Sequence, residues 1–249
     1  RGSINPIKEF LQFLKILSIY IKERPDIVHH VSAKPILYGT LAALILRVKA
    51  IVNAPVGLGY IFSSQDIKAR LLRPLILTAY RVFCNPRNSR VVFENNDDLN
   101  SFIQWNAVRH TDAVLIRGAG VDLKKFYPVE KNKKDLVSVV LVARMLRDKG
   151  IVEFVQAAQS LYEEGIKARF VLVGSSDAMN PTSLSDHELN SLNGVKGVEW
   201  MGWCADVPKL LGDSDIACLP SYREGLPKSL IEAAASGLPI VTTDTEGCR

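Results

Sequence analysis

Two glutamates are the residues of this sequence whose type and spacing most directly suggest chemistry. Glu224 and Glu232 lie in SYREGLPKSLIEAAASGLP, residues 221–239, with seven residues between them. Pro227 suits the first turn of a helix, so Glu224 is expected at a helix N-terminus and Glu232 inside that helix. Helix N-termini attract anions, and a carboxylate accepts hydrogen bonds from vicinal hydroxyls. The pattern favours a site for a diphosphate that carries hydroxyl-bearing groups, although an ordinary helix with one solvated glutamate has the same pattern.

Three cations form a second group, in VLVARMLRDKG at residues 140–150. Arg144, Arg147 and Lys149 follow an apolar strand and precede a helix. Cations in such a position can neutralise a diphosphate leaving group without a metal, and we expect no D-x-D-type metal site. A solvated basic turn would have the same composition. Both groups follow strands of one predicted sheet, however, so we expect them at the same sheet edge.

The elements that must position these residues alternate between strands and helices. Continuous apolar strands in this order predict an α/β fold with parallel sheets that helices cover on both faces. Strands are expected at 26–31, 50–55, 89–94, 112–116, 136–144, 168–174, 197–202, 215–220 and 239–243. Helices are expected in the opening residues and at 35–48, 65–84 with an interruption at Pro74, 97–105, 150–165, 183–194, 206–211 and 227–236.

One polar segment interrupts this alternation. GAGVDLKKFYPVEKNKKD, residues 118–135, is rich in glycine and lysine and is typical of a linker between domains. The sequence therefore predicts a domain at 1–118, a linker at 119–135 and a domain at 136–249. Two doubly wound, Rossmann-like parallel-sheet domains that face a cleft are expected, with ligands at the carboxyl ends of the strands.

Composition excludes several classes of protein. A hydrophobic content of 47% with 23% charged residues is typical of a globular protein with a large core. The four cysteines form no C-x-x-C pair, which favours reduced thiols over a disulfide framework or a zinc site. The apolar run at 35–46 is too short to cross a bilayer, and no signal peptide is visible. A Rossmann dehydrogenase is disfavoured because no G-x-G-x-x-G follows a strand.

Basic residues concentrate in the first half, where residues 1–118 hold 16 basic and 8 acidic side chains. The stretch 65–84 mixes leucine and isoleucine with Lys68, Arg70, Arg73 and Arg81. A basic amphipathic helix suits an anionic membrane surface, and a core helix with a solvated basic edge is the alternative. Nucleic acid is not an expected partner, since no recognisable module or aromatic stacking array is present.

Together, ARMLRDKG and SYREGLPKSLIEAAASGLP resemble the nucleotide-sugar half of the GT-B glycosyltransferases of family 4, which retain the anomeric configuration. GVD and FYP at 120–128 match the interdomain segment of that family, and the resemblance covers essentially the whole chain. PDIVHHVSAKPILYG and NAPVGLGYIF resemble a bacterial subgroup. That subgroup transfers an N-acetylhexosamine or a related sugar from a UDP-sugar to an undecaprenyl-diphosphate-linked acceptor, in the synthesis of O-antigens, capsules and protein-linked glycans.

The resemblance implies roles for individual residues. Negative charge develops on the leaving oxygen, so Arg144 and Lys149 are expected to be catalytic, and the resemblance implies that Glu224 is catalytic as well. The sugar is expected to pass through an oxocarbenium-like state. No nucleophilic carboxylate is assigned, no metal is expected, and the UDP-sugar is a co-substrate rather than a cofactor. The implied donor-binding residues are Arg144 and Lys149 for the diphosphate, Glu224 with the N–H groups of Gly225 and Leu226 for the sugar, Glu232 for the ribose, and Gly174, Met201 and Gly202 near the base.

The first half is expected to bind the acceptor. Candidates on that side are His29, His30, Lys34, Gly57 and Gly59, although a buried histidine at a strand end is more often structural. The resemblance also implies a cytoplasmic protein at the inner face of the cell membrane. It further implies that a first βα unit before Arg1 and the last helices after Arg249 are missing, as in a fragment truncated at both ends.

Two other functions fit part of the pattern. Another GT-B enzyme, such as a UDP-sugar epimerase, would share the architecture but not this pair of glutamates with its cations. A non-catalytic nucleotide-sugar-binding or membrane-scaffold protein would keep the site without turnover. Release of UDP that requires an acceptor would distinguish the transferase from the epimerase. Loss of turnover without loss of UDP binding on substitution of Glu224 would argue against the scaffold.

Overall fold

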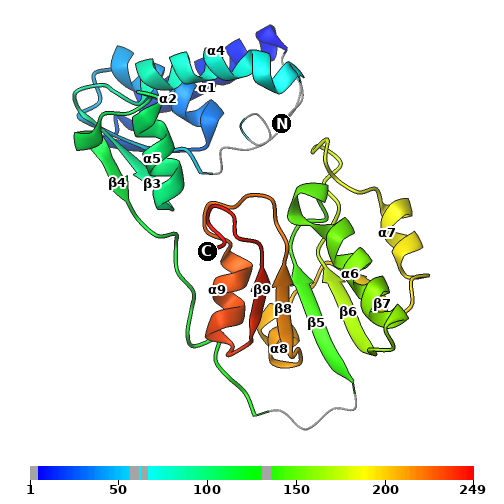
Figure 1. Ribbon diagram of the computed structural model, residues 1–249. Helices are drawn as coiled ribbons and strands as arrows, with labels where there is room; N and C mark the ends of the chain where they lie inside the picture. The colour runs from blue at the N-terminus through cyan, green and yellow to red at the C-terminus, as the bar shows by residue number, and fades with distance from the viewer. Residues whose placement is uncertain (1–4, 57–61, 63–66, 131–135) are drawn as a thin grey trace. The chain divides into compact units, whose positions relative to one another are not determined.

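A computed structural model describes residues 5–56, 62, 67–130 and 136–249 (Figure 1). The chain divides after Gly118 into two compact units, Ser3–Gly118 and Ala119–Arg249. Phe126, which lies in the expected linker segment, is buried in the core of the second unit. At least this part of the segment therefore packs with the second unit.

The first unit contains one sheet of four parallel strands, paired in the order β1-β2-β3-β4. Side chains of Asn5 and Asn95 accept hydrogen bonds from the first N–H groups of α1 and α5, which fixes the start of both helices. The elements are α1 (Pro6–Glu23), β1 (Ile27–Val31), α2 (Ala33–Ile45), β2 (Ala50–Ala54), α4 (Ile67–Phe83), β3 (Ser89–Phe93), α5 (Asn96–Gln104) and β4 (Ala113–Leu115).

The helices α2, α4 and α5 of the first unit contribute to one core. Right-handed crossovers between strands paired in chain order place the connecting helices on the same face. Ile36 of α2, Tyr80 of α4 and Phe102 of α5 accordingly pack in one cluster with Val91 and Phe93 of β3. On β1 the buried and exposed residues alternate, so that His30 is buried while Ile27 and Val31 are exposed.

Helix α4 differs from the sequence prediction because Pro74 does not interrupt it. The helix runs unbroken from Ile67 to Phe83 with Pro74 inside. A proline removes one backbone donor from a helix. Ile76 and Leu77, just beyond the proline, pack against the core that contains Tyr80, and this apolar contact favours continuation of the helix.

The second unit contains five parallel strands in the order β7-β6-β5-β8-β9 (Figure 1). The chain moves from β5 outward to β7 and then returns to β8 on the other side of β5. The pair β5–β8 is therefore the topological switch point of the sheet. The elements are β5 (Val137–Val142), α6 (Ile151–Glu163), β6 (Ala168–Val173), α7 (Asp186–Leu192), β7 (Val198–Gly202), α8 (Val207–Gly212), β8 (Ile216–Leu219), α9 (Lys228–Ala235) and β9 (Ile240–Thr242).

Helices cover both faces of this second sheet. Leu141 of β5 packs with Phe154 of α6 in one core cluster. Its neighbour Val140 belongs to a second cluster, with Leu211 of α8 and Ala233 of α9. Successive strand residues point to opposite faces, so the two clusters lie on opposite sides of the sheet. This is the doubly wound arrangement that the sequence predicts.

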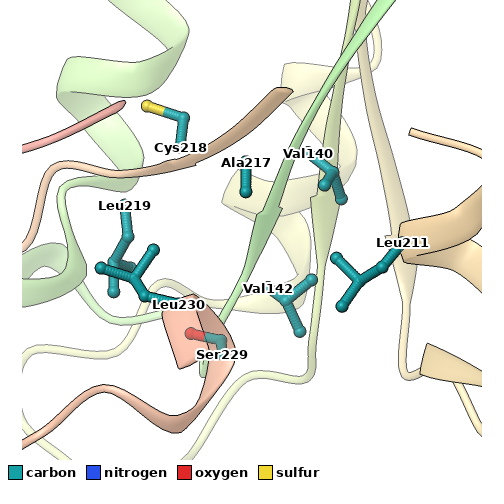
Figure 2. A pocket seen from close by; sticks show the side chains of 8 residues that line it. All are labelled: Val140, Val142, Leu211, Ala217, Cys218, Leu219, Ser229 and Leu230. Atoms are coloured by element: carbon teal, nitrogen blue, oxygen red, sulfur yellow. The ribbon is translucent and has the colours of Figure 1, made fainter. Parts of the chain in front are cut away.

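Helix α9 packs on the sheet with little space beneath it. The gap between them has a volume of about 10 Å³, which is room for one water at most (Figure 2). Its lining is almost wholly apolar and consists of Val140, Val142, Leu211, Ala217, Cys218, Leu219, Ser229 and Leu230. The gap is too small to bind a ligand, and the close packing fixes the helix that carries Glu232.

Candidate functional site

The strand order brings the two groups of candidate residues together. Arg144, Arg147 and Lys149 follow β5, and Glu224 follows β8. The two strands are hydrogen-bonded neighbours, with Val139 opposite Ile216. Parallel neighbours lie about 4.8 Å apart, so the loops at their carboxyl ends meet at one sheet edge. Ligands of doubly wound sheets bind at such a switch point.

Lys149 and Glu224 form the direct link between these loops. Lys149 Nζ lies 2.5 Å from Glu224 Oε1. Only 19% of the lysine side chain and 12% of the glutamate side chain are exposed. Two charges this far removed from water stabilise each other, and removal of one leaves the other without compensation.

Backbone contacts hold the same two loops together. The Asp148 carbonyl accepts hydrogen bonds from the Tyr222 N–H at 3.0 Å and from Ser221 Oγ at 3.1 Å. Gly150 has a φ of +75°, and a Cβ at this position would lie 2.2 Å from the Pro220 carbonyl oxygen. Glycine is therefore required here both for its conformation and for the close approach of the β8 end.

The two arginines of the basic group have other partners. Arg144 Nη1 lies 2.9 Å from Asp177 Oδ2, in the loop after β6. Arg147 Nη2 lies 2.5 Å from Glu188 Oε1. Glu188 also completes a capping box with Ser185 at the start of α7. Sequence reasoning missed both acidic partners, although the S-x-x-E pattern at 185–188 is a recognisable helix-start signal.

Glu232 lies on α9, as the sequence predicts. Its carboxylate pairs with Lys228 one turn earlier, at 3.5 Å, and 13% of its side chain is exposed. Helix α9 begins after Pro227, which supplies no side-chain cap to the first N–H groups. Those groups face the β8–α9 loop, where Gly225 and Leu226 lie between Glu224 and Pro227.

Gly174 and Gly202 lie side by side at the ends of β6 and β7. The Gly174 N–H donates to the Gly202 carbonyl at 2.8 Å, and the Gly174 carbonyl accepts from Trp200 Nε1 at 2.9 Å. Gly174 has a φ of +144°, and a Cβ there would lie 1.8 Å from the Ala143 carbonyl oxygen. Met201, the residue directly before Gly202 in β7, is exposed. The residues expected near the base therefore occupy the same carboxyl edge as the loop after β5.

In the first unit, His30 belongs to a buried hydrogen-bond network. Its Nδ1 lies 2.8 Å from Asn53 Oδ1 and its Nε2 lies 2.8 Å from the Tyr20 hydroxyl. The side chain is buried, and Gly39 packs so closely that a Cβ there would lie 2.4 Å from the ring. Burial lowers the pKa of His30, so the neutral ring is favoured. Both ring nitrogens are occupied, which gives His30 a structural role.

The other acceptor-side candidates are placed differently. His29 is exposed on the opposite side of β1 from His30. Lys34 Nζ lies 2.5 Å from Glu9 Oε1, and the Tyr38 hydroxyl donates to Glu9 Oε2 at 2.7 Å, so these residues join α2 to α1. Gly57 and Gly59 lie outside the described residues.

Two features are absent from the part of the chain that the structure describes. Within residues 5–56, 62, 67–130 and 136–249, no group of three His, Cys, Asp or Glu side chains is arranged to hold a metal ion. In the same parts of the chain, no helix combines the length and hydropathy needed to cross a membrane. The four cysteines are all free thiols.

Two protein-family models together match most of the chain. Residues 137–249 match the family model "Glycosyl transferases group 1". Residues 1–95 match the model "Glycosyl transferase 4-like".

Two curated bacterial proteins are similar over almost the whole chain. The N,N'-diacetylbacillosaminyl-diphospho-undecaprenol alpha-1,3-N-acetylgalactosaminyltransferase of Campylobacter jejuni is 33% identical over 100% of the chain and 66% of its own length. The UDP-Gal:alpha-D-GlcNAc-diphosphoundecaprenol alpha-1,3-galactosyltransferase of Escherichia coli is 29% identical over 98% of the chain and 64% of its own length. The chain thus spans just under two thirds of these relatives.

Solved structures share the fold. HepE of Anabaena, crystallised with UDP and glucose, matches with a TM-score of 0.72 and 17% identity, over 94% of the chain and 63% of HepE. Sucrose-phosphate synthase of Thermosynechococcus elongatus matches with a TM-score of 0.76 and 19% identity, over 99% of the chain and 64% of the synthase. At these identities the likeness concerns the arrangement of strands and helices alone.

Proposed function

The chain belongs to the glycosyl transferases of group 1 and the related 4-like group, and from this membership we propose that the protein transfers a sugar from a UDP-sugar to an undecaprenyl-diphosphate-linked glycan. The sugar proposed is an N-acetylhexosamine. Support comes from the two similar transferases, whose names specify diphospho-undecaprenol acceptors, and from the fold shared with HepE, which binds UDP. The product would be a bacterial surface polysaccharide or a related glycan.

The observation that carries this proposal is the Lys149–Glu224 pair at the β5–β8 switch point. A nucleotide diphosphate needs positive charge at its phosphates, and a sugar needs acceptors for its hydroxyls. Lys149 and the uncapped N-terminus of α9 provide the first. Glu224 provides the second, since a carboxylate that binds Lys149 through one oxygen retains another acceptor oxygen. Glu232, which lies within α9, is the proposed acceptor of hydrogen bonds from the ribose hydroxyls.

These groups favour the transition state over the ground state. When the bond between the sugar and the diphosphate breaks, negative charge grows on the leaving oxygen. Lys149 and the α9 N–H groups are already directed to the sheet edge and need no reorganisation. Arg144 lies in the same loop and would add charge after release from Asp177. The site thus stabilises the leaving group by fixed positive charge, and we propose that no metal is required.

The proposed reaction retains the anomeric configuration. The names of both relatives specify an alpha linkage in the product, and the E. coli relative uses UDP-Gal, a donor in which the sugar is alpha-linked to the diphosphate. Retention arises either from two successive inversions through a covalent intermediate or from attack on the side from which the diphosphate leaves. Because no nucleophilic carboxylate is assigned, we propose attack on the side from which the diphosphate leaves. Fixed cations around the diphosphate keep it in place during that attack.

We also propose that α4 contacts an anionic membrane surface, where a lipid-linked acceptor is available. Ile67, Leu71, Leu75 and Val82 of α4 are each between 59% and 72% exposed, and their spacing puts them on one face of the helix. Arg70 and Arg81, both exposed, border this face. An exposed apolar stripe with basic neighbours is the pattern of a helix that lies in a membrane interface. The location proposed is the inner face of the cell membrane.

Calorimetric titration of UDP into the protein, with GDP as a comparison and with chelator present, tests the donor site. UDP should bind without divalent metal. Glu232→Ala should weaken UDP binding by roughly 10- to 100-fold, because the ribose loses a charged acceptor worth roughly 1.5–3 kcal/mol. Glu163→Ala, at the far end of α6, is the matched control and should bind UDP as the parent does.

The titration distinguishes the proposed donor site from a nucleotide site elsewhere and from a scaffold role. UDP binding that Glu232→Ala leaves unchanged would place the nucleotide elsewhere. A folded parent that binds neither nucleotide would contradict the donor-site proposal and favour a scaffold role. Binding followed by UDP release only in the presence of a lipid-diphosphate glycan would identify a transferase rather than an epimerase.

A further inference from the structure

Ser221 lies at the point where three segments of the second unit meet. It directly follows Pro220 at the end of β8 and is fully buried, with 0% of its surface exposed. Its hydroxyl donates to the Asp148 carbonyl at 3.1 Å and lies 3.2 Å from the Arg223 carbonyl. One hydroxyl thus joins the turn after β5 to the loop after β8, the two segments that carry Lys149 and Glu224.

The carbonyl of Ser221 connects to a third segment, the turn after β9. It accepts hydrogen bonds from the Thr243 hydroxyl and from the Thr245 hydroxyl, the latter at 3.3 Å. Thr242 Oγ1 donates to the Leu219 carbonyl at 2.8 Å. Three threonine side chains, one at the end of β9 and two in the turn after it, therefore fix the backbone at Leu219 and Ser221.

The same turn also holds Glu224 directly. The Glu224 N–H donates to the Glu246 carbonyl at 3.1 Å. Gly247 has a φ of +77° and packs so closely that a Cβ there would lie 2.4 Å from the carbonyl oxygens of Glu224 and Gly225. The backbone of Glu224 is thus held from the β9 side, while its carboxylate is held by Lys149.

We propose that Ser221 is a positioning residue for the Lys149–Glu224 pair. Lys149 is adjacent to Asp148, whose carbonyl accepts from Ser221, and Glu224 lies three residues after Ser221 in the same loop. Loss of the hydroxyl would leave the Tyr222 N–H to hold the Asp148 carbonyl without it, so the contact between the two loops beside the pair would weaken. The hydroxyl would then set the geometry in which the pair meets a substrate, without touching that substrate. The inference rests on the proposed transferase function.

The test compares Ser221→Ala with Ser214→Ala. Ser214 is a matched control, a buried serine at the opposite end of β8 whose hydroxyl donates to the Leu210 carbonyl at 2.8 Å. Both variants lose one buried hydroxyl, so both should lose stability in urea unfolding. At a temperature where both are folded, Ser221→Ala should lower kcat by about 10- to 100-fold, since small misplacement of catalytic groups has effects of this size. Ser214→Ala should keep the parental kcat.

A second measurement does not depend on transfer activity. Amide hydrogen exchange in 143–150 and 221–227 should be faster in Ser221→Ala than in Ser214→Ala, with equal exchange in β6. A parent that transfers no sugar would contradict the proposed function, and the exchange rates alone would then decide the role of Ser221. Equal exchange in these segments, or an active parent whose kcat is the same in both variants, would overturn the positioning role.

Discussion

The Lys149–Glu224 pair is stable because each charge compensates the other. Neither loop could bury its charge alone without the cost of desolvation. The pair also explains why a lysine suits this position. A lysine presents a compact charge with three donors, so one ammonium group can bind Glu224 and still donate to a phosphate.

A double-mutant cycle measures this compensation. We expect Lys149→Met and Glu224→Gln each to lower the free energy of unfolding by about 1–3 kcal/mol, because each leaves a largely buried charge without its opposite charge. The double variant should lose clearly less than the sum of the single losses. Urea unfolding of the four proteins provides the values. Strictly additive losses would show that the two side chains do not interact in solution.

His30 makes the stability of the first unit depend on pH. Its pKa is lowered in the folded protein by burial, whereas in the unfolded chain it is about 6.5. Between the two values the unfolded chain binds more protons, so the contribution of His30 is complete above about pH 6.5 and is lost as the pH falls toward the folded pKa. Unfolding at pH 7.5 and 5.5 should show this loss in the parent and in His29→Gln, but less of it in His30→Gln. An equal pH dependence in both variants would exclude His30 as its source.

The helices and strands of the second unit constrain the site through two glycines, one at the start of α6 and one directly after β6. Gly150 permits α6 to begin against the end of β8, and Gly174 permits the end of β6 to approach the loop after β5. These contacts are between backbones, so no side-chain rearrangement can relieve a substitution there.

Gly150→Ala tests this constraint, with Gly165→Ala as the control. Both positions have a positive φ, +75° and +84°, but a Cβ at Gly165 would meet no atom within 4 Å. Both variants should lose about 1–2 kcal/mol from left-handed backbone strain. Gly150→Ala should lose more, because of the Pro220 contact, and should also weaken UDP binding. Equal losses of stability with parental UDP affinity in both variants would indicate that α6 can shift without disturbing the site.

For the molecule as a whole, charge is divided unequally between the halves of the chain. Residues 1–118 hold 16 basic and 8 acidic side chains, whereas residues 119–249 hold 15 and 18. The exposed apolar stripe of α4 belongs to the basic half. A protein whose acceptor is anchored in a membrane would gain from one basic, partly apolar surface, because attraction to anionic lipid holds it near the acceptor.

Vesicle flotation tests this surface. We expect the protein to bind vesicles that contain anionic lipid more strongly than purely zwitterionic ones, with weaker binding at high salt. Leu71→Asp should reduce the binding roughly tenfold, since one leucine contributes roughly 1.5–3 kcal/mol on burial. Ile166→Asp, a change of another exposed apolar residue in the second unit, should have little effect. Equal binding by both variants would show that α4 is not the contact surface.

Local pattern alone was enough to locate the elements and the loops that carry chemistry. The signals used were apolar runs of strand length, the proline at 227 that marks a helix start, and glycines at helix ends. Each is set by residues close together in the sequence, so these signals predicted β5, β8 and α9 and placed Glu224 and Lys149 beside them. The continuous α4 was the exception, because the packing of its apolar face outweighed the effect of Pro74.

Which side chain each charged residue pairs with depends instead on the order of the strands in the sheet, and no local sequence pattern specifies that order. Lys149 and Glu224 are 75 residues apart in the sequence and meet only because β8 returns to pair with β5. The same long-range packing directs Arg144 to Asp177 and encloses His30 between Tyr20 and Asn53. Periodicity shows which residues face a core or a sheet edge, whereas contacts between distant segments select the neighbour that each charge and hydrogen-bonding group finds there.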